Sequence, residues 1–296
     1  MTTTTPLSTT MLPGLAGLAD RYDGFILDLW GVIHDGNTAY PWAAATLAEL
    51  RRAGKATVLL SNAPRRAHAL IAGMERMGIP RDLYGEVVSS GEAVRHELEV
   101  RRDPFYAALG RRCHHLGPER DRNIFEGLDL DLVADPADAD FVLNTGPWEF
   151  EETVADYEDR LRLFAGRGMP MVCANPDHMV IREGRPVVCA GALAARYETL
   201  GGRVSYRGKP DPAIYALCLD LLGIADHRRV AVVGDAIETD IAGATKAGLD
   251  SILVTGGLHA SELGVTYGES ADPHRVASLL SRFNLSPVAA IPAFAW

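Results

Sequence analysis

Short runs of apolar residues recur along this sequence, and each run ends at a polar residue or a glycine before an amphipathic stretch begins. The first three runs are residues 25–27, 56–60 and 86–89, and the stretches after them have the apolar spacing that is typical of helices. Strands that alternate with helices are joined by right-handed crossovers and form a parallel sheet covered on both faces. The sequence therefore predicts an α/β fold with a doubly wound, Rossmann-like parallel sheet.

The alternation becomes irregular in the middle of the chain and resumes at residue 191, with strands expected at 229–233 and 251–254. In the irregular part we expect strands at residues 114–116, 141–144 and 171–174 and helices near residues 122–132 and 151–165. The predicted organisation is a core domain from residues 20–100 and 191–296, a smaller inserted α/β cap domain at residues 101–190, and a disordered or loosely docked tail at residues 1–19. The apolar segment 287–296 is expected to dock on the body or on a neighbouring subunit.

Composition excludes several classes of function. The net charge of −10 argues against wholesale binding of nucleic acid. The apolar runs are too short to span a bilayer, and the N-terminus lacks the basic segment and apolar core of a secretory signal. The four cysteines have no metal-type spacing, so we interpret them as reduced thiols. We expect a cytoplasmic protein without nucleic-acid or membrane partners.

Carboxylate side chains follow two of the strands predicted for the core domain. Asp28 stands directly after residues 25–27, and Asp235 follows residues 229–233, with Asp240 five positions further on. Because the carboxyl ends of parallel strands meet at one edge of a sheet, we expect these carboxylates to lie close together. Their oxygens are ligands suited to Mg²⁺, and without a cation they would repel one another. The pattern therefore predicts a Mg²⁺ site.

Two further polar residues are suited to phosphate. Ser61 ends the strand at 56–60, and its hydroxyl and the backbone N–H groups of the next helix can hold phosphate oxygens. Lys209, in a turn before a helix, can neutralise Asp28 and the charge that develops on a phosphoryl group. Asp28 itself could attack phosphorus and form an aspartyl phosphate. The simpler alternative is that Asp28 only caps the following helix.

Four motifs occur in order along the chain: Asp28-Leu29-Trp30-Gly31-Val32, Ser61-Asn62, Gly208-Lys209-Pro210-Asp211 and Gly234-Asp235-Ala236-Ile237-Glu238-Thr239-Asp240. Their order and strand context resemble the haloacid dehalogenase-like (HAD) hydrolase superfamily. The insert between the second and third motifs resembles the class IIA arrangement with a C2-type cap. Three further segments match its NagD-like, 4-nitrophenylphosphatase-like branch: His34-Asp35, Asn175-Pro176-Asp177 and Gly191-Ala192-Leu193.

This resemblance implies a Mg²⁺-dependent phosphatase that acts on a small phosphorylated metabolite through an aspartyl phosphate. Asp28 would be the nucleophile and a metal ligand, together with the backbone carbonyl of Trp30 and with Asp235, while Asp240 would stand in the outer coordination sphere. Ser61 and Lys209 would bind the transferred phosphoryl group. The remaining candidates for phosphate or substrate binding are Asn62, Asn175 and Asp177, although the last two are equally consistent with an ordinary Asx-Pro turn. The family also forms dimers through such caps, so a homodimer is one option.

The sequence departs from the family at Trp30, where the family's phosphatases carry an Asp that protonates the leaving group and then activates water. An indole N–H cannot do either, and losing general acid–base catalysis typically costs about 10²–10⁴ in rate. We favour phosphoryl transfer to Asp28 that relies on a good leaving group or on a substitute acid, His34 or Asp35. Two alternatives stay open: an acyl phosphate that hydrolyses slowly, and a ligand-binding or regulatory protein with little turnover.

Overall fold

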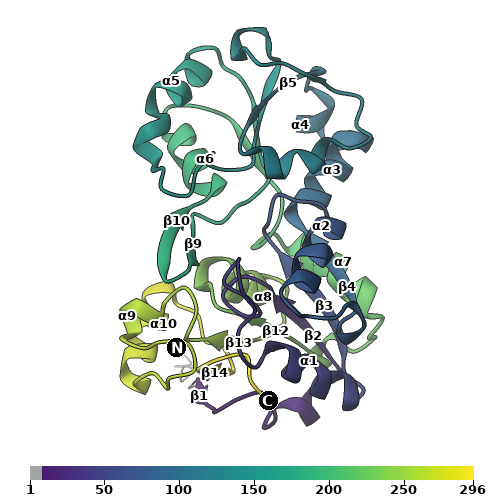
Figure 1. The fold of residues 1–296 in the computed structure, drawn as a ribbon, viewed down its shortest axis with the longest axis vertical. Coiled ribbons are helices and arrows are strands. Elements are labelled where there is room, and N and C mark those ends of the chain that lie inside the picture. Colours follow the sequence, from purple (N-terminus) through teal and green to yellow (C-terminus); the bar gives the residue numbers. More distant parts are fainter. Residues whose placement is uncertain (1–8) are drawn as a thin grey trace, which may run out of the picture. The chain divides into compact units, whose positions relative to one another are not determined.

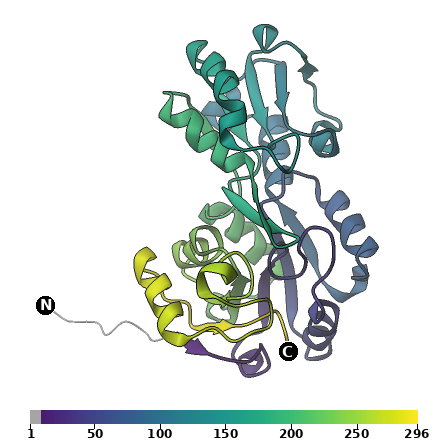
Figure 2. The same ribbon diagram turned by 60° about the vertical axis from the view of Figure 1, so that its left-hand side comes forward.

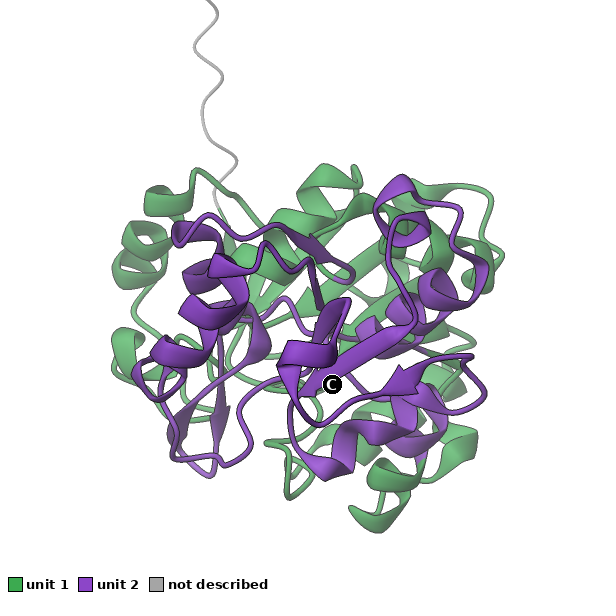
Figure 3. Ribbon diagram, turned by 90° about the horizontal axis from the view of Figure 1, so that it is seen from above, with its two compact units in different colours: residues 1–60, 72–87, 209–296 green, residues 61–71, 88–208 purple. Residues whose placement is uncertain are grey.

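The computed structural model describes residues 9–296 and divides into two compact units, which Figure 3 colours separately. The first unit comprises the described residues up to 60, residues 72–87 and residues 209–296. The second comprises residues 61–71 and 88–208, and so contains the whole segment predicted as an inserted cap. None of the helices within residues 9–296 has both the length and the apolar character needed to cross a bilayer.

The larger sheet has seven strands in the order β1-β14-β13-β12-β2-β3-β4 (Figure 1). Its strands are β1 (Thr10–Met11), β2 (Gly24–Asp28), β3 (Ala56–Ser61), β4 (Glu86–Ser89), β12 (Val230–Gly234), β13 (Asp250–Val254) and β14 (Ala289–Ile291). The pairings from β1 through to β3 are all parallel. The predicted parallel α/β fold is confirmed.

The central strand β2 explains why Asp28 reaches the edge of this sheet. All five of its residues are buried, as expected for a strand covered on both faces. Leu27 pairs with Val233 of β12 on one side and with Leu59 of β3 on the other, and Asp28 pairs with Leu60. Asp28 is therefore the last residue of a fully paired strand, at its carboxyl end.

Helices connect the strands much as the sequence predicts. They are α1 (Ala43–Arg52), α2 (Ala67–Arg76), α3 (Ser90–Val100), α7 (Pro212–Leu222), α8 (Ala242–Lys246), α9 (Ala260–Leu263) and α10 (Pro273–Phe283). Local signals set their ends: α7 begins after Asp211, whose side chain accepts a hydrogen bond from Ala213 N, and ends at Gly223 in the left-handed conformation. One prediction needs refinement, because the helix expected at 239–247 begins with a π-helical turn, Ile237–Ile241, before α8.

The second unit has its own parallel sheet, in the order β11-β8-β7-β5-β6. Its strands are β5 (Arg112–Leu116), β6 (Asp131–Leu132), β7 (Phe141–Asn144), β8 (Met171–Cys173) and β11 (Val204–Tyr206), with an antiparallel hairpin of β9 (Met179–Arg182) and β10 (Arg185–Val188). The helices beside it are α4 (Pro104–Ala107), α5 (Glu158–Gly166) and α6 (Ala190–Thr199), with 3₁₀ turns at Glu119–Phe125, Pro136–Asp138 and Val154–Tyr157.

The helix predicted at residues 122–132 is wrong. A 3₁₀ helix covers Glu119–Phe125, and the chain then forms the edge strand β6. Gly127 adopts a φ of +74°, which ends any helical path at that point. Strands β6 and β11 and the β9–β10 hairpin were not predicted either.

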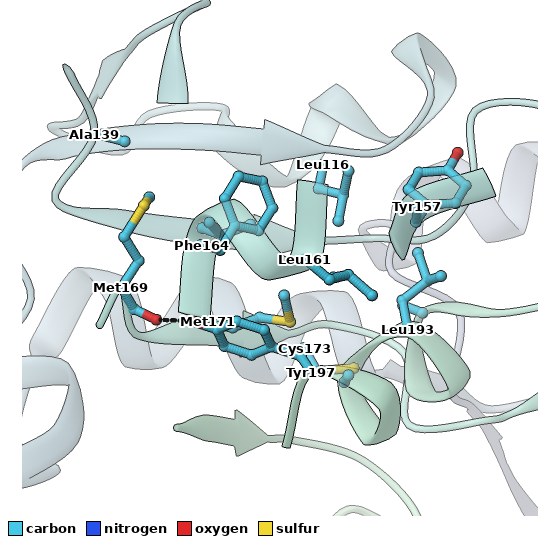
Figure 4. Packing of buried hydrophobic residues seen from close by; sticks show 13 residues of the cluster. Leu116, Ala139, Tyr157, Leu161, Phe164, Met169, Met171, Cys173, Leu193 and Tyr197 are labelled. Atoms are coloured by element: carbon cyan, nitrogen blue, oxygen red, sulfur yellow. Dashed lines mark hydrogen bonds between the residues drawn. The ribbon is translucent and has the colours of Figure 1, made fainter. Parts of the chain in front are cut away.

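Large aromatic side chains fill the core of the second unit (Figure 4). Tyr157, Phe164 and Tyr197 are fully buried around the sheet residue Met171. The hydroxyl of Tyr197 donates to the carbonyl oxygen of Met169, so this buried polar atom is satisfied. This unit therefore has a hydrophobic core of its own.

The terminal segments complete one edge of the larger sheet (Figure 2). Strand β14 lies between β13 and β1, and Phe294 beyond it is fully buried. The expected docking of residues 287–296 on the body is confirmed. Residues 1–8 of the predicted tail lie outside the described residues, whereas β1 and the buried Leu15 belong to the fold from residue 9 onward.

Candidate active site

Three buried carboxylates gather at the carboxyl edge of the larger sheet. Asp28 ends β2, Asp235 directly follows the neighbouring strand β12, and Asp240 lies in the π-helical turn after it. One oxygen from each of Asp28, Asp235 and Asp240 lies within 4.8 Å of the other two. The structure thus brings together the three carboxylates that the spacing suggested.

Lys209 lies between two of these carboxylates. Its Nζ donates to Oδ1 of Asp28 at 2.6 Å and to Oδ1 of Asp240 at 2.8 Å, and the lysine is 2% exposed. One ammonium group against three carboxylates leaves this cluster of four side chains with excess negative charge. Charges taken out of water are costly unless they are compensated, so the cluster is suited to binding a further cation.

Burial raises the pKa of Asp28 well above its usual range. The ammonium of Lys209 opposes this effect by lowering the pKa of Asp28, whereas the carboxylates of Asp240 and Asp235 raise it further. Burial therefore disfavours the ionised form of Asp28, and a divalent cation beside it would favour the carboxylate.

Two glycines and one backbone N–H hold Asp235 in place, and none of them was predicted as a site residue. A Cβ atom on Gly31 would lie 1.8 Å from Oδ2 of Asp235, and one on Gly257 would lie 2.2 Å from it. The backbone N–H of Leu258 donates to the same oxygen at 2.7 Å. The sequence does contain a signal for these two residues, because glycines come shortly after Asp28 and shortly after the strand β13.

Asp240 is fixed by contacts on both of its oxygens. Oδ1 accepts from Lys209, and Oδ2 accepts from the backbone N–H of Ala236 at 3.1 Å. The hydroxyl of Tyr215 donates to the carbonyl oxygen of Thr239 at 3.1 Å and supports this turn from α7. Since Asp240 already accepts hydrogen bonds at both oxygens, its arrangement is consistent with a position in the outer coordination sphere of a metal ion.

Trp30 packs against the loop that follows Asp28. Its ring meets the ring of His34 edge-on, with centroids 5.7 Å apart, and a Cβ atom on Gly36 would lie 2.0 Å from the indole. Nδ1 of His34 accepts from the backbone N–H of Gly36 at 3.0 Å. In the neutral imidazole this places the proton on Nε2, which can then act as a donor.

Asp35, the other candidate for a substitute acid, is engaged in its own turn. Its Oδ1 accepts from the backbone N–H groups of Asn37 and Thr38 at 2.9 and 2.7 Å and from the hydroxyl of Thr38. Burial acts to raise the pKa of Asp35, but these hydrogen bonds outweigh it and hold the pKa below its ordinary value. A carboxyl stabilised in its ionised form is a poor general acid, so these hydrogen bonds argue against Asp35 in that role.

The remaining predicted site residues belong to the second unit. Ser61 is the last residue of β3, and its Oγ accepts from the backbone N–H of Ala63 at 3.2 Å. Nδ2 of Asn62 donates to Oδ1 of Asp177 at 2.8 Å, and Oδ1 of Asn175 accepts from the backbone N–H of Asp177 at 3.0 Å. Asn175 therefore makes the Asx-type turn that was the alternative reading, and Asp177 is linked to Asn62.

The donor set at the sheet edge fits a small divalent cation. Mg²⁺ prefers carboxylate and carbonyl oxygens, and the cluster offers carboxylate oxygens from Asp28 and Asp235 on adjacent strands. Softer ligands that would favour zinc, such as cysteine thiolates, are not part of this cluster of described residues.

Comparisons with known proteins also indicate a hydrolase of the haloacid dehalogenase-like type. A family model described as haloacid dehalogenase-like hydrolase matches residues 25–131, and one described as HAD-hydrolase-like matches residues 206–282. A crystal structure of a haloacid dehalogenase-like family hydrolase from Brucella suis is 35% identical, with a TM-score of 0.82, and the match covers 96% of this chain and 100% of that one.

Two other relatives carry more specific names. Ribonucleotide monophosphatase NagD of Escherichia coli is 27% identical over 79% of this chain and 87% of its own length. A glycerol phosphate phosphatase from Mycobacterium tuberculosis, solved in complex with magnesium, is 25% identical with a TM-score of 0.60, over 83% of this chain and 72% of that one.

Proposed function

Because this chain belongs to the haloacid dehalogenase-like hydrolases, within the NagD-like branch of phosphoric monoester hydrolases, we propose that it cleaves a small phosphorylated metabolite through a phosphorylated Asp28. The observation that carries the proposal is the buried cluster of Asp28, Asp235 and Asp240 around Lys209. The relatives named for nucleotide and glycerol phosphates support a small phosphate ester as the substrate class.

In the proposed reaction a carboxylate oxygen of Asp28 attacks phosphorus, and the bond between phosphorus and the leaving-group oxygen breaks. The leaving oxygen takes up a proton, and water then attacks the acyl phosphate to release inorganic phosphate and restore the carboxylate. Lys209 already bonds to Asp28, so its charge stands where negative charge develops in the transition state. By the family resemblance, Ser61 would hold a phosphoryl oxygen.

We propose Mg²⁺ as the resident cation, held by Asp28, Asp235 and the backbone carbonyl of Trp30. When bound, the cation supplies Lewis-acid stabilisation of the phosphoryl oxygens. Leu258 and the two glycines around Asp235 would keep that carboxylate oriented, and Asp240 would orient Lys209 and the outer coordination sphere.

Protonation of the leaving group is the step that Trp30 leaves without the family's usual acid. We propose that the preferred substrate has a leaving group that needs no acid from the protein, or that His34, when protonated on both ring nitrogens, supplies the proton from Nε2. The hydrogen bond from Gly36 N–H to Nδ1 favours the first option, because it stabilises the neutral imidazole, which is too weak an acid to give up its Nε2 proton. We also propose a cytoplasmic location, which fits four cysteines that are all buried free thiols.

Hydrolysis of 4-nitrophenyl phosphate in the presence of Mg²⁺ tests this function, with the wild-type chain compared with Asp28→Asn. We expect turnover in the wild type that is lost in Asp28→Asn and on addition of EDTA. Mass spectrometry of the acid-quenched wild type should find a phosphoryl group on Asp28. Equal background rates in both proteins would instead support the alternative, a protein that binds a phosphorylated ligand without turnover.

A further inference from the structure

The chain turns tightly after Asp28, in residues 29–40, which we call the Asp28 loop. The carbonyl oxygen of Leu29 accepts from two backbone N–H groups further along this loop, at 2.8 and 3.0 Å. Trp30, whose backbone carbonyl is the proposed third ligand of the cation, lies inside this turn. The shape of the Asp28 loop therefore decides whether that carbonyl can act as a ligand.

A hydrogen bond from a distant segment of the first unit reaches the loop at Val32. The hydroxyl of Tyr267 donates to the carbonyl oxygen of Val32 at 2.7 Å, across 235 positions of the chain. Val32 is fully buried and stands two residues after Trp30. Burial raises the pKa of Tyr267, so the phenol keeps the proton that this hydrogen bond requires.

The ring of Tyr267 also packs on the end of the Asp28 loop. It stacks on the ring of Tyr40, with centroids 3.6 Å apart and planes 5° apart. Burial raises the pKa of both tyrosines, and the nearby charge of Asp235 adds to that effect. Tyr267 thus contacts the loop near its start and at its end, close to the carboxylate cluster.

Tyr267 is itself held by two other segments of the first unit. Its hydroxyl oxygen accepts from the backbone N–H of Phe294 at 3.0 Å, and the next residue, Gly268, donates from its N–H to the carbonyl oxygen of Pro292 at 3.2 Å. A Cβ atom on Gly256, shortly after β13, would lie 2.8 Å from the Cα of Tyr267. A donor that is anchored in this way can fix the loop that it contacts.

We propose that Tyr267 is a positioning residue for the reaction proposed above. Its hydroxyl holds the Asp28 loop in the shape that the carbonyl of Trp30 needs in order to act as a metal ligand. This inference rests on the proposed function, because that function supplies the cation. Contacts that orient metal ligands from outside typically contribute about 10–100-fold to metal affinity or activity.

The variant Tyr267→Phe tests the proposal, because it removes the hydroxyl and keeps the stacked ring. Isothermal titration calorimetry of the full chain with Mg²⁺ should show an affinity weakened by at least about tenfold. The Mg²⁺ concentration that gives half-maximal hydrolysis of 4-nitrophenyl phosphate should rise by a similar factor. The KM for this substrate at saturating Mg²⁺ should stay that of the wild type, because Tyr267 acts on the loop and not on the substrate.

Tyr22→Phe is the matched control within the first unit. It removes the hydroxyl of another buried tyrosine, which donates to Oδ2 of Asp250 at 2.7 Å. Asp250 begins β13, so this hydrogen bond lies at the amino edge of the sheet, away from the carboxylate cluster. We expect Tyr22→Phe to bind Mg²⁺ as the wild type does, although it also loses a buried hydrogen bond.

The outcomes separate this role from the proposed function. An unchanged Mg²⁺ affinity in Tyr267→Phe, or an equal loss in Tyr267→Phe and Tyr22→Phe, would overturn the positioning role. A wild type that binds Mg²⁺ without any turnover would count against the proposed phosphatase, and the difference in Mg²⁺ affinity between the two variants would still decide the role of Tyr267. A wild type that does not bind Mg²⁺ would overturn both proposals.

Discussion

Nζ of Lys209 lies 2.6 Å from Oδ1 of Asp28, although 181 positions separate the two residues in the chain. The lysine reaches the carboxylate from the turn before α7, and the carboxylate is the last residue of the central strand. The pair is buried, so each charge depends on the other for compensation. This dependence makes the pair a sensitive place to test both stability and catalysis.

Lys209→Met should damage both properties. With the ammonium gone, buried carboxylates face one another without compensation, so we expect the free energy of unfolding in EDTA to fall by about 3–5 kcal/mol. We also expect turnover of 4-nitrophenyl phosphate to fall by at least about 10²-fold. Urea denaturation and steady-state kinetics measure the two effects. Lys246→Met, at an exposed position of α8, should change neither, and an active, fully stable Lys209→Met would contradict the proposed role.

Gly31→Ala should disable the site. Gly31 has a φ of +81°, and its new methyl group would overlap the carboxylate of Asp235. Gly54→Ala is the matched control, because Gly54 has a φ of +69° but no atoms within 4 Å of an added Cβ. Both variants carry a backbone cost of about 1–2 kcal/mol.

Only Gly31→Ala should lose the thermal stabilisation that Mg²⁺ gives the wild type, which is about 2.7 kcal/mol at a hundredfold excess over Kd. Thermal denaturation with and without Mg²⁺ measures this difference. An equal response of the two variants to Mg²⁺ would show that the packing of Gly31 on Asp235 does not matter for the metal.

Trp30→Asp should restore the missing general acid. If protonation of the leaving group limits turnover, the rate on alkyl phosphates should rise by up to about 10²–10⁴, with a much smaller gain on 4-nitrophenyl phosphate. Trp30→Asn is the control, since it opens the same space beside Gly36 without a transferable proton. Rates across a series of leaving groups measure the effect. A folded Trp30→Asp that binds Mg²⁺ and gains nothing over Trp30→Asn would contradict this explanation.

Asp121 should make the stability of the second unit depend on pH. Burial raises the pKa of Asp121 from its ordinary 3.8 to about 6, and Arg65, 3.6 Å away, opposes the rise only in part. The folded chain therefore binds the proton more tightly than the unfolded chain. This contribution is fully present below pH 3.8 and is lost as the pH rises through about 6, a change of about 3 kcal/mol.

Asp121→Asn removes that contribution. The difference in free energy of unfolding between wild type and variant should therefore change between pH 4 and about pH 7.5, which urea denaturation across that range measures. The variant is needed as a reference because the pKa of His115, lowered to about 4 by burial, acts in the opposite sense over the same range. A difference that does not vary with pH would contradict the assignment.

The parallel order of the larger sheet and the meeting of Asp28 with Asp235 could be predicted, because both follow from where apolar runs end. Strand ends are strong local signals, and adjacent parallel strands place them at one edge. The motif around Lys209 predicts that this residue belongs to the site. The two hydrogen bonds that it makes depend on tertiary packing and could not be predicted.

Other features could not be read from the residues alone. Strand β6 has two residues, and β14 has three with little β-branching, so pairing with neighbours decides their conformation rather than propensity. The roles of Gly31 and Gly257 depend on how closely two loops approach Asp235, and no local pattern encodes that approach. Asp35 is a candidate acid by sequence alone, because the three hydrogen bonds that its carboxylate accepts form only in the folded turn.

The burial of Phe294 limits how the chain can be engineered. Its ring is fully enclosed, its carbonyl oxygen accepts from the hydroxyl of Thr46, and the carbonyl of the next residue, Ala295, accepts from Leu15 N–H. Trp296, in contrast, is 36% exposed. An affinity tag fused after Trp296 would therefore extend into solvent. Deleting the last three residues would instead remove the buried ring of Phe294 and the hydrogen bond that Leu15 N–H donates.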